Sequence, residues 1–279
     1  MAAPLPVEGE VVEASAKKAE KPISLWDYPA TYSLMGVNIA VFLIMVWWGH
    51  LWRAGSGGNF VMTEFDTRTL LAFGASDAAQ VIHGEWWRLL TAAFVHVTLL
   101  HIGLNMWCLW NLGVFGEPLL GRRGLICVYL LTGITGNLFS LGRAAFSGND
   151  AMVAGASGAV FGIAGILIVL LSNRKLSLPW EELRGLRRQV IFFAVANLVL
   201  GMGSGFVAAL PVARLHDVPR IDNSAHLGGL ISGLALGLPL FPRMTSGKQS
   251  YRQRQSVTFV VAALMLCLIG YAIKAFSGN

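Results

Sequence analysis

The chain has 279 residues, of which 55% are hydrophobic and only 13% are charged, and its formal net charge is +6. A soluble domain carries about 25% charged residues, so the composition excludes an ordinary soluble protein and indicates a polytopic membrane protein. The basic residues lie in short loops rather than on one folded face, which argues against a nucleic-acid partner.

The amino-terminal segment 1–30 mixes glutamates with lysines ahead of the first long apolar run. We predict a flexible, solvated cytoplasmic tail here. Organellar import sequences are poor in acidic residues, and no small-residue cleavage site follows the first apolar run, so neither a transit peptide nor a cleaved signal peptide is expected. A bacterial cell (inner) membrane is therefore the expected location.

Seven apolar runs follow, and each is close to the ~20 residues that a helix needs to cross the hydrocarbon core. Backbone polar groups in lipid must be satisfied internally, so the runs predict helices and an all-α fold. The predicted spans are 31–49, 93–115, 124–142, 152–172, 187–210, 224–242 and 256–276. Most of the 21 lysines and arginines fall on one side if the amino terminus is cytoplasmic, which places the carboxyl terminus outside.

Two connections are longer than the rest. The outer loop 50–92 contains "AGSGG" and "GEWWRLL", and loops of about this length are usually functional. We expect it to rest partly in the membrane interface, where tryptophans are favoured. The connection 172–189 is predicted to be an ordinary cytoplasmic loop.

The polar residues of the spans restrict the chemistry. None of the 15 aspartates and glutamates lies in the middle of a predicted span, which argues against a proton-relaying transporter and an aspartyl intramembrane protease. The zinc-protease motif HExxH is also absent from the sequence. Three histidines and several asparagines remain as candidates.

Ser157 lies in "GASGAVFG", about five residues into its predicted span, and His226 lies about two residues into its own. Both spans are predicted to run from outside to inside, so the two side chains should lie at similar depth. Glycine stripes beside each residue would let the two helices approach closely. A histidine next to a serine can act as its general base.

The segment "HVTLLHIGLN" adds His101 and Asn105, which are four residues apart and therefore face the same way. Their side chains can donate hydrogen bonds to a developing oxyanion, as can the backbone N–H of Ser157. His96 should point about 140° away from His101, so we expect it to be a structural residue whose loss lowers stability more than turnover.

These motifs resemble those of the rhomboid intramembrane serine proteases. The matches are "HVTLLHIGLN", "GASG", "AHLGGLISG", the "WR" of Trp87 and Arg88, and "GEPLLG" around Glu117, in the same order as in the family. The resemblance implies a six-helix core over 31–243, followed by a linker and seventh helix at 244–279 without a catalytic role.

The resemblance also implies residue roles. Ser157 would be the nucleophile, His226 the base, and His101 with Asn105 the oxyanion donors. Supporting residues would be His96, Phe161, Gly155, Gly158, Trp87, Arg88 and Glu117. Phe161 stands where relatives often have a tyrosine stacked on the catalytic histidine. No cofactor or metal is required, and the partners would be transmembrane substrates and the lipid bilayer.

Three alternatives stay open at this point. Asp222 precedes His226 by four residues and could orient it, although we expect Asp222 to be solvated at the outer boundary. The chain could instead be an inactive rhomboid relative that binds membrane clients, although such proteins usually lack the serine or the histidine. A histidine-lined transporter would need His96, His101 and His226 to converge.

Overall fold

A computed structural model describes residues 26–53, 65–147, 152–176, 179–208, 222–244 and 247–277. This part of the chain is helical apart from loops and one isolated β-bridge between Ser76 and Val153, which confirms the predicted all-α class. The predicted tail lies largely outside the described residues, as do the middle of the 50–92 loop and the loop before Asp222.

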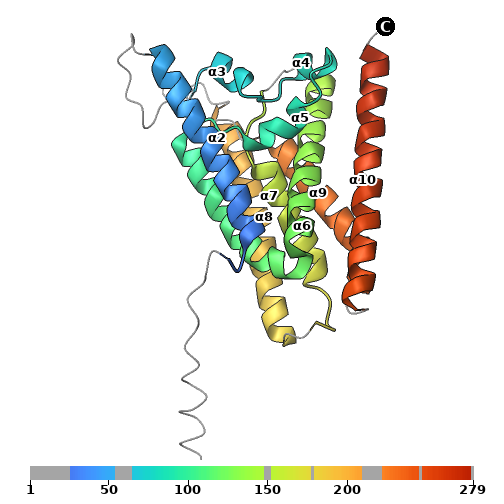
Figure 1. Ribbon diagram of the computed structural model, residues 1–279. Coiled ribbons are helices and arrows are strands. Elements are labelled where there is room, and N and C mark those ends of the chain that lie inside the picture. The colour runs from blue at the N-terminus through green and yellow to red at the C-terminus, as the bar shows by residue number, and fades with distance from the viewer. Residues whose placement is uncertain are drawn as a thin grey trace, which may run out of the picture.

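The long helices stand side by side, and the short helices gather at one end of the bundle (Figure 1). We call this the α3–α5 end; the start of α2 lies at the opposite end, and the last helix ends on the α3–α5 side. The elements are α2 (Pro29–Arg53), α3 (Thr67–Ala72), α4 (Ala78–Ile82), α5 (Arg88–Thr91), η1 (Ala92–Phe94), α6 (Leu99–Ser147), α7 (Ser157–Leu170), α8 (Trp180–Ala208), α9 (Asn223–Leu240), η2 (Phe241–Arg243) and α10 (Lys248–Ser277).

α6 contains two predicted spans, which meet at a bend. Gly121 has a φ of 73°, a left-handed conformation that glycine adopts without steric cost, and the helix reverses direction there. The first span was predicted to begin at residue 93, but the chain forms a 3₁₀ turn over Ala92–Phe94 and becomes α-helical only at Leu99. His96 therefore precedes the helix instead of lying within it.

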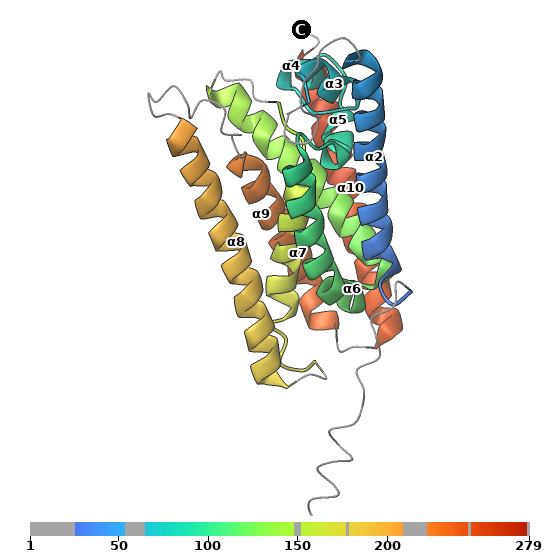
Figure 2. The same cartoon turned by 90° about the vertical axis from the view of Figure 1, so that its left-hand side faces the viewer.

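α7 lies at the centre of the bundle, between α6 and α9 (Figure 2). Most of its residues are buried, from Gly158 through Leu167 without interruption. Its 14 residues span about 21 Å, less than the ~30 Å core of a bilayer. The helix begins at Ser157, whereas the sequence predicted a span from residue 152, because Met152–Ala156 form the bridge, bend and turn that precede it.

Two further helices, α8 and α10, complete the bundle. α8 begins at Trp180, directly after Pro179, so it occupies much of the segment predicted to be a cytoplasmic loop. The acidic side chains of Glu181 and Glu182 in its first turn favour a helix start at this point. α10 is largely exposed along its length, in keeping with an outer, lipid-facing position.

By length and apolar composition, segments Pro29–Gly49, Leu99–Ser147 and Lys248–Ala275 could cross a membrane. The number of membrane crossings stays a prediction.

α10 touches the core through Gln255, whose side chain donates a hydrogen bond of 2.9 Å to the Leu120 carbonyl beside the α6 bend. A bend leaves such a carbonyl without its helical partner, so Gln255 satisfies it.

Candidate active site

Ser157 is the first residue of α7, and the chain before it is tightly held. The Gly155 N–H donates to the Ala92 carbonyl at 2.9 Å, and Val153 pairs with Ser76 in both directions. Gly155 has a φ of +131°, and a Cβ there would lie 2.7 Å from Cε1 of His101. Only glycine suits this position, because any side chain would be strained and would collide with the imidazole.

A cavity of about 430 Å³ opens beside Ser157 and is lined by residues of α6, α7, α8 and α9. It holds the sequence-predicted residues Ser157, His226, His101, Asn105 and Phe161 together. These residues come from three helices that are far apart along the chain, so their convergence is a property of the packing.

His226 lies one turn into α9, with its ring stacked on Phe161 at a centroid distance of 4.4 Å and an interplanar angle of 12°. The side chain is buried, and its Nδ1 has no hydrogen-bond partner among the described residues. Stacking fixes the plane of the imidazole, so its rotation about Cβ is restricted. No hydrogen bond within the described part of the chain joins His226 to Ser157; catalytic hydrogen bonds are often long in free enzymes.

Glycines bring α7 and α9 into backbone contact. A Cβ at Gly229 would overlap the Gly158 carbonyl, and a Cβ at Gly233 would overlap the Gly162 carbonyl. The same holds for Gly165 against a carbonyl of α9. The glycine stripes therefore act as predicted: they shorten the distance between the helix that carries the serine and the helix that carries the histidine.

His101 and Asn105 occupy the first two turns of α6 and face the cavity together. The Asn105 side chain donates to the His101 carbonyl at 3.0 Å, which leaves one amide hydrogen for another acceptor. The N–H of Ser157 belongs to the first turn of α7, where backbone donors have no partner within the helix. Ser157, His101 and Asn105 therefore bring these donors to the wall of one cavity.

The predicted orientation of His96 is wrong. Helical periodicity placed it away from His101, but the two ring centroids are 5.2 Å apart. His96 is fully buried, and its Nε2 accepts a hydrogen bond of 3.4 Å from the Ala156 N–H, directly before Ser157. Periodicity failed because His96 lies ahead of Leu99, where the helix starts.

Asp222 also differs from expectation. Instead of being solvated, its carboxylate caps α9 by accepting from the Ser224 N–H at 2.9 Å, and it also accepts a hydrogen bond from the Ser140 hydroxyl. The Arg143 guanidinium lies 3.7 Å away. The sequence did not predict a role for Ser140, because a lone serine in an apolar helix has no distinguishing pattern.

The remaining supporting residues lie outside the cavity. Arg88 is buried beneath Trp87 and donates to the carbonyls of Leu71 and Ala75 at 2.6 and 3.0 Å, which orders the short-helix segment. Both carboxylate oxygens of Glu117 accept from the first residues of α2, namely the N–H of Ala30 and the N–H and hydroxyl of Thr31. Glu117 thus caps a neighbouring helix.

α8 contributes two cavity residues that the sequence did not single out, Phe193 and Asn197. Phe193 also packs on Phe161 with a centroid distance of 5.8 Å. Asn197 is a polar residue of a predicted span, but nothing in its spacing links it to Ser157. Within the described residues no group of three or more His, Cys, Asp and Glu side chains could hold a metal ion.

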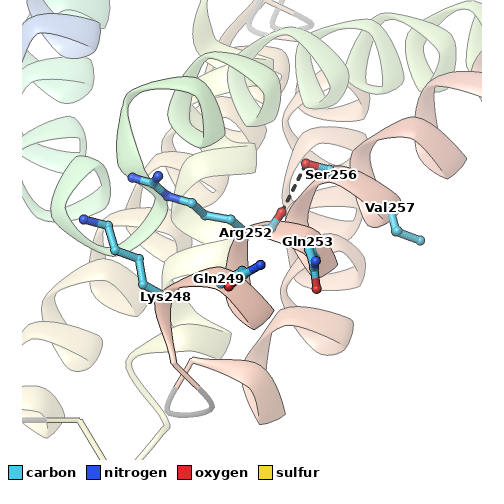
Figure 3. A pocket seen from close by; sticks show the side chains of 6 residues that line it. All are labelled: Lys248, Gln249, Arg252, Gln253, Ser256 and Val257. Atoms are coloured by element: carbon cyan, nitrogen blue, oxygen red, sulfur yellow. Dashed lines mark hydrogen bonds between the residues drawn. The ribbon is translucent and has the colours of Figure 1, made fainter.

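A second hollow lies on α10 and is lined by Lys248, Gln249, Arg252, Gln253, Ser256 and Val257 (Figure 3). Its serine hydroxyl donates to the Arg252 carbonyl of the same helix at 3.1 Å, and no histidine lines the hollow. This arrangement lacks the parts of a nucleophilic site.

The fold and the cavity define the class of the chain: an all-α integral membrane protein with a serine and two histidines lining one space between its helices. Residues 83–243, more than half of the chain, match the family model described as the Rhomboid domain. The chain belongs to the rhomboid family.

Several curated proteins are similar to the chain. The Rhomboid protease GluP of Bacillus subtilis (strain 168) is 40% identical over 179 residues, which cover 62% of this chain and 31% of that protein. RHOMBOID-like protein 6, mitochondrial, of Arabidopsis thaliana is 25% identical over 275 residues, covering 86% and 82%. Rhomboid-like protease 2 of Toxoplasma gondii is 27% identical over 240 residues, covering 85% and 75%. The chain thus spans under a third of the Bacillus relative and most of the other two.

Proposed function

We propose that this chain is an intramembrane serine endopeptidase that hydrolyses peptide bonds in or near the ends of transmembrane segments, with Ser157 as nucleophile and His226 as general base. The observation that carries the proposal is the shared cavity, in which the serine at the start of α7 lies with a histidine held by Phe161. Membership of the rhomboid family supports it, as do relatives whose names describe proteases.

The reaction would proceed in two steps. The Ser157 hydroxyl attacks the scissile carbonyl while His226 takes its proton and passes it to the leaving amine. Water then hydrolyses the acyl-enzyme, with His226 as base. His101, Asn105 and the Ser157 N–H would donate to the oxyanion formed in each step.

The substrate must be locally extended, because a helical carbonyl is engaged by the N–H four residues later. A substrate helix would approach laterally from the lipid, unwind near the α3–α5 end and place its chain in the cavity. α8 stands at the edge of the bundle in Figure 2, and its Phe193 and Asn197 form part of the cavity wall that such a chain would meet.

The first prediction tests the nucleophile and the base. A serine-reactive fluorophosphonate should label the wild-type protein in detergent and should not label Ser157→Ala. Cleavage of a model transmembrane substrate should fall to background in both Ser157→Ala and His226→Ala, because Ser157 is the one serine among the residues lining the cavity and His101, the other histidine there, is assigned to the oxyanion.

Ser256→Ala is the matched control, since this hydroxyl lies on α10 and bonds to its own helix. It should retain wild-type labelling and cleavage. Equal labelling of the wild type and Ser157→Ala would remove the assignment of the nucleophile. Metal-dependent uptake into vesicles that survives Ser157→Ala would favour a transporter.

A second prediction separates the oxyanion donors from the Ser157–His226 pair. Asn105→Ala and His101→Ala each remove one donor while the Ser157 N–H remains. Loss of one such donor typically costs about 10²–10³ in turnover, so residual cleavage should be measurable in both variants. Initial rates normalised to folded protein provide the measurement, and wild-type turnover in both variants would contradict the assignment.

A further inference from the structure

The first turn of α9 carries His226, and its position depends on a carboxylate that the reaction does not use directly. We infer that Asp222 is a positioning residue, which fixes this turn against α6 through Ser140 and thereby sets where the His226 ring lies. The inference rests on the proposed function, in which His226 is the general base.

The contacts of Asp222 reach in two directions. One carboxylate oxygen accepts from the Ser224 N–H at 2.9 Å, which caps the helix. The other accepts a hydrogen bond from the hydroxyl of Ser140, a fully buried residue near the end of α6. Arg143, almost one turn further along α6, lies 3.7 Å from the carboxylate. One side chain therefore joins the start of α9 to α6.

The backbone transmits this contact to the histidine. The Asp222 carbonyl accepts the His226 N–H at 3.3 Å, so the capping residue and the imidazole belong to the same helical turn. The Ala225 carbonyl within that turn faces two glycines: a Cβ at Gly136 would lie 2.7 Å from it, and a Cβ at Gly158 3.3 Å. Gly136 precedes Ser140 by four residues, so the packed contact and the polar contact share one face of α6.

Asp222 does not act as the acid of a catalytic triad. In a triad the carboxylate accepts from Nδ1–H of the histidine. Here the Nδ1 of His226 has no partner in the described part of the chain, and the carboxylate oxygens are engaged by Ser224 and Ser140. The Asp222 carboxylate therefore holds the first turn of α9 in place, and that turn sets the position of the His226 ring.

The two mechanisms predict opposite results for a conservative substitution. Asparagine caps helices about as well as aspartate and keeps an oxygen that can accept from Ser224 or Ser140. We expect Asp222→Asn to keep kcat within about threefold of wild type. Loss of a triad carboxylate to asparagine lowers kcat about 10⁴-fold in serine proteases, so a triad acid would give a far larger effect.

Asp222→Ala removes both contacts. A misplacement of about 1 Å can cost about 10²-fold in rate, so kcat should fall by about 10- to 100-fold while KM changes little. Amide hydrogen exchange over residues 223–227 should become faster in Asp222→Ala and stay near wild type in Asp222→Asn. Exchange does not require catalysis, so it can also be measured in a Ser157→Ala background.

Ser140→Ala tests the partner. It should lower kcat in the same direction as Asp222→Ala, and the double variant should be no worse than Asp222→Ala alone, because both remove one connection. Asp66→Ala is the matched control: Asp66 caps α3 by accepting from the Thr69 N–H at 2.8 Å and is not among the residues lining the cavity. It should leave kcat and exchange over 223–227 unchanged.

Three results would overturn the inference. They are wild-type kcat and exchange in Asp222→Ala, a loss of 10³-fold or more in folded Asp222→Asn, and additive effects of Ser140→Ala and Asp222→Ala. Failure of the proposed function would look different, because the wild type would then not cleave substrate, or Ser157→Ala would still cleave it.

Discussion

His96 lies directly behind the segment that leads to the nucleophile. Its Nε2 accepts from the Ala156 N–H, and its ring packs against His101, so it touches both the serine's turn and an oxyanion donor. Substitution would leave the Ala156 N–H without a partner in a buried position. A buried donor without a partner typically costs about 1–3 kcal/mol.

We therefore predict that folded His96→Ala loses turnover as well as thermal stability. Turnover should fall by about 10-fold or more, since the turn that places Ser157 is no longer held. This replaces the expectation from helical periodicity, in which loss of His96 lowers thermal stability more than turnover. Thermal unfolding and initial cleavage rates of the monodisperse fraction provide the measurements, and wild-type turnover would contradict the prediction.

At the scale of elements, the contact between α7 and α9 is the one that the site depends on. The Gly229 Cα faces the Gly158 carbonyl, and neither backbone can move aside easily. Gly229→Ala should therefore destabilise the protein by about 1–3 kcal/mol or more, as overpacking does in other cores. It should also reduce cleavage, because separation of the two helices moves His226 away from Ser157.

Gly103→Ala is the matched control for this prediction. Gly103 also lies in a helix, α6, but a Cβ there would meet nothing within 4 Å. Alanine is favoured over glycine inside a helix by roughly 0.5–1 kcal/mol, so this variant should be as stable as wild type or slightly more stable. Equal thermal stability of Gly229→Ala and Gly103→Ala would show that the α7–α9 contact tolerates an added methyl group, and would contradict the prediction.

At the scale of the whole molecule, the prediction concerns orientation. We propose that the amino terminus is cytoplasmic, because the basic residues of the loops then fall mostly inside. Arg123 follows the α6 bend at Gly121 by two residues, and Lys248 begins α10. The bend and the start of α10 both lie at the end opposite α3–α5 (Figure 1). Reporter fusions after these two residues should read as cytoplasmic.

Arg143 lies inside α6 (Leu99–Ser147), so a fusion is better placed after Ser147, where the helix ends. That fusion, and one after Arg220 outside the described residues, should read as external. A fusion after Arg188, which the sequence placed in a loop, would now interrupt α8; Lys175 is the better site on that side and should read as cytoplasmic. Reversed readings would place the Ser157 cavity near the cytoplasmic surface and contradict the proposed location of cleavage.

The sequence by itself determined the all-α membrane class and the family, because both depend on local patterns. Apolar runs of about the length of a bilayer predict helices wherever they occur. The spacing of His101 and Asn105 within one helix predicts a shared face, and the glycine stripes predict close helix packing. Each of these relations holds within a single element, so residue numbers are enough to derive it.

Only the tertiary structure decided which side chains from different elements meet. His96 lies against His101 because α6 starts at Leu99, and periodicity says nothing about residues ahead of a helix. Asp222 joins Ser140, 82 positions away in the chain, because two helices cross there. Contacts of this kind depend on how far and at what angle helices pack, and no spacing along the chain encodes that distance.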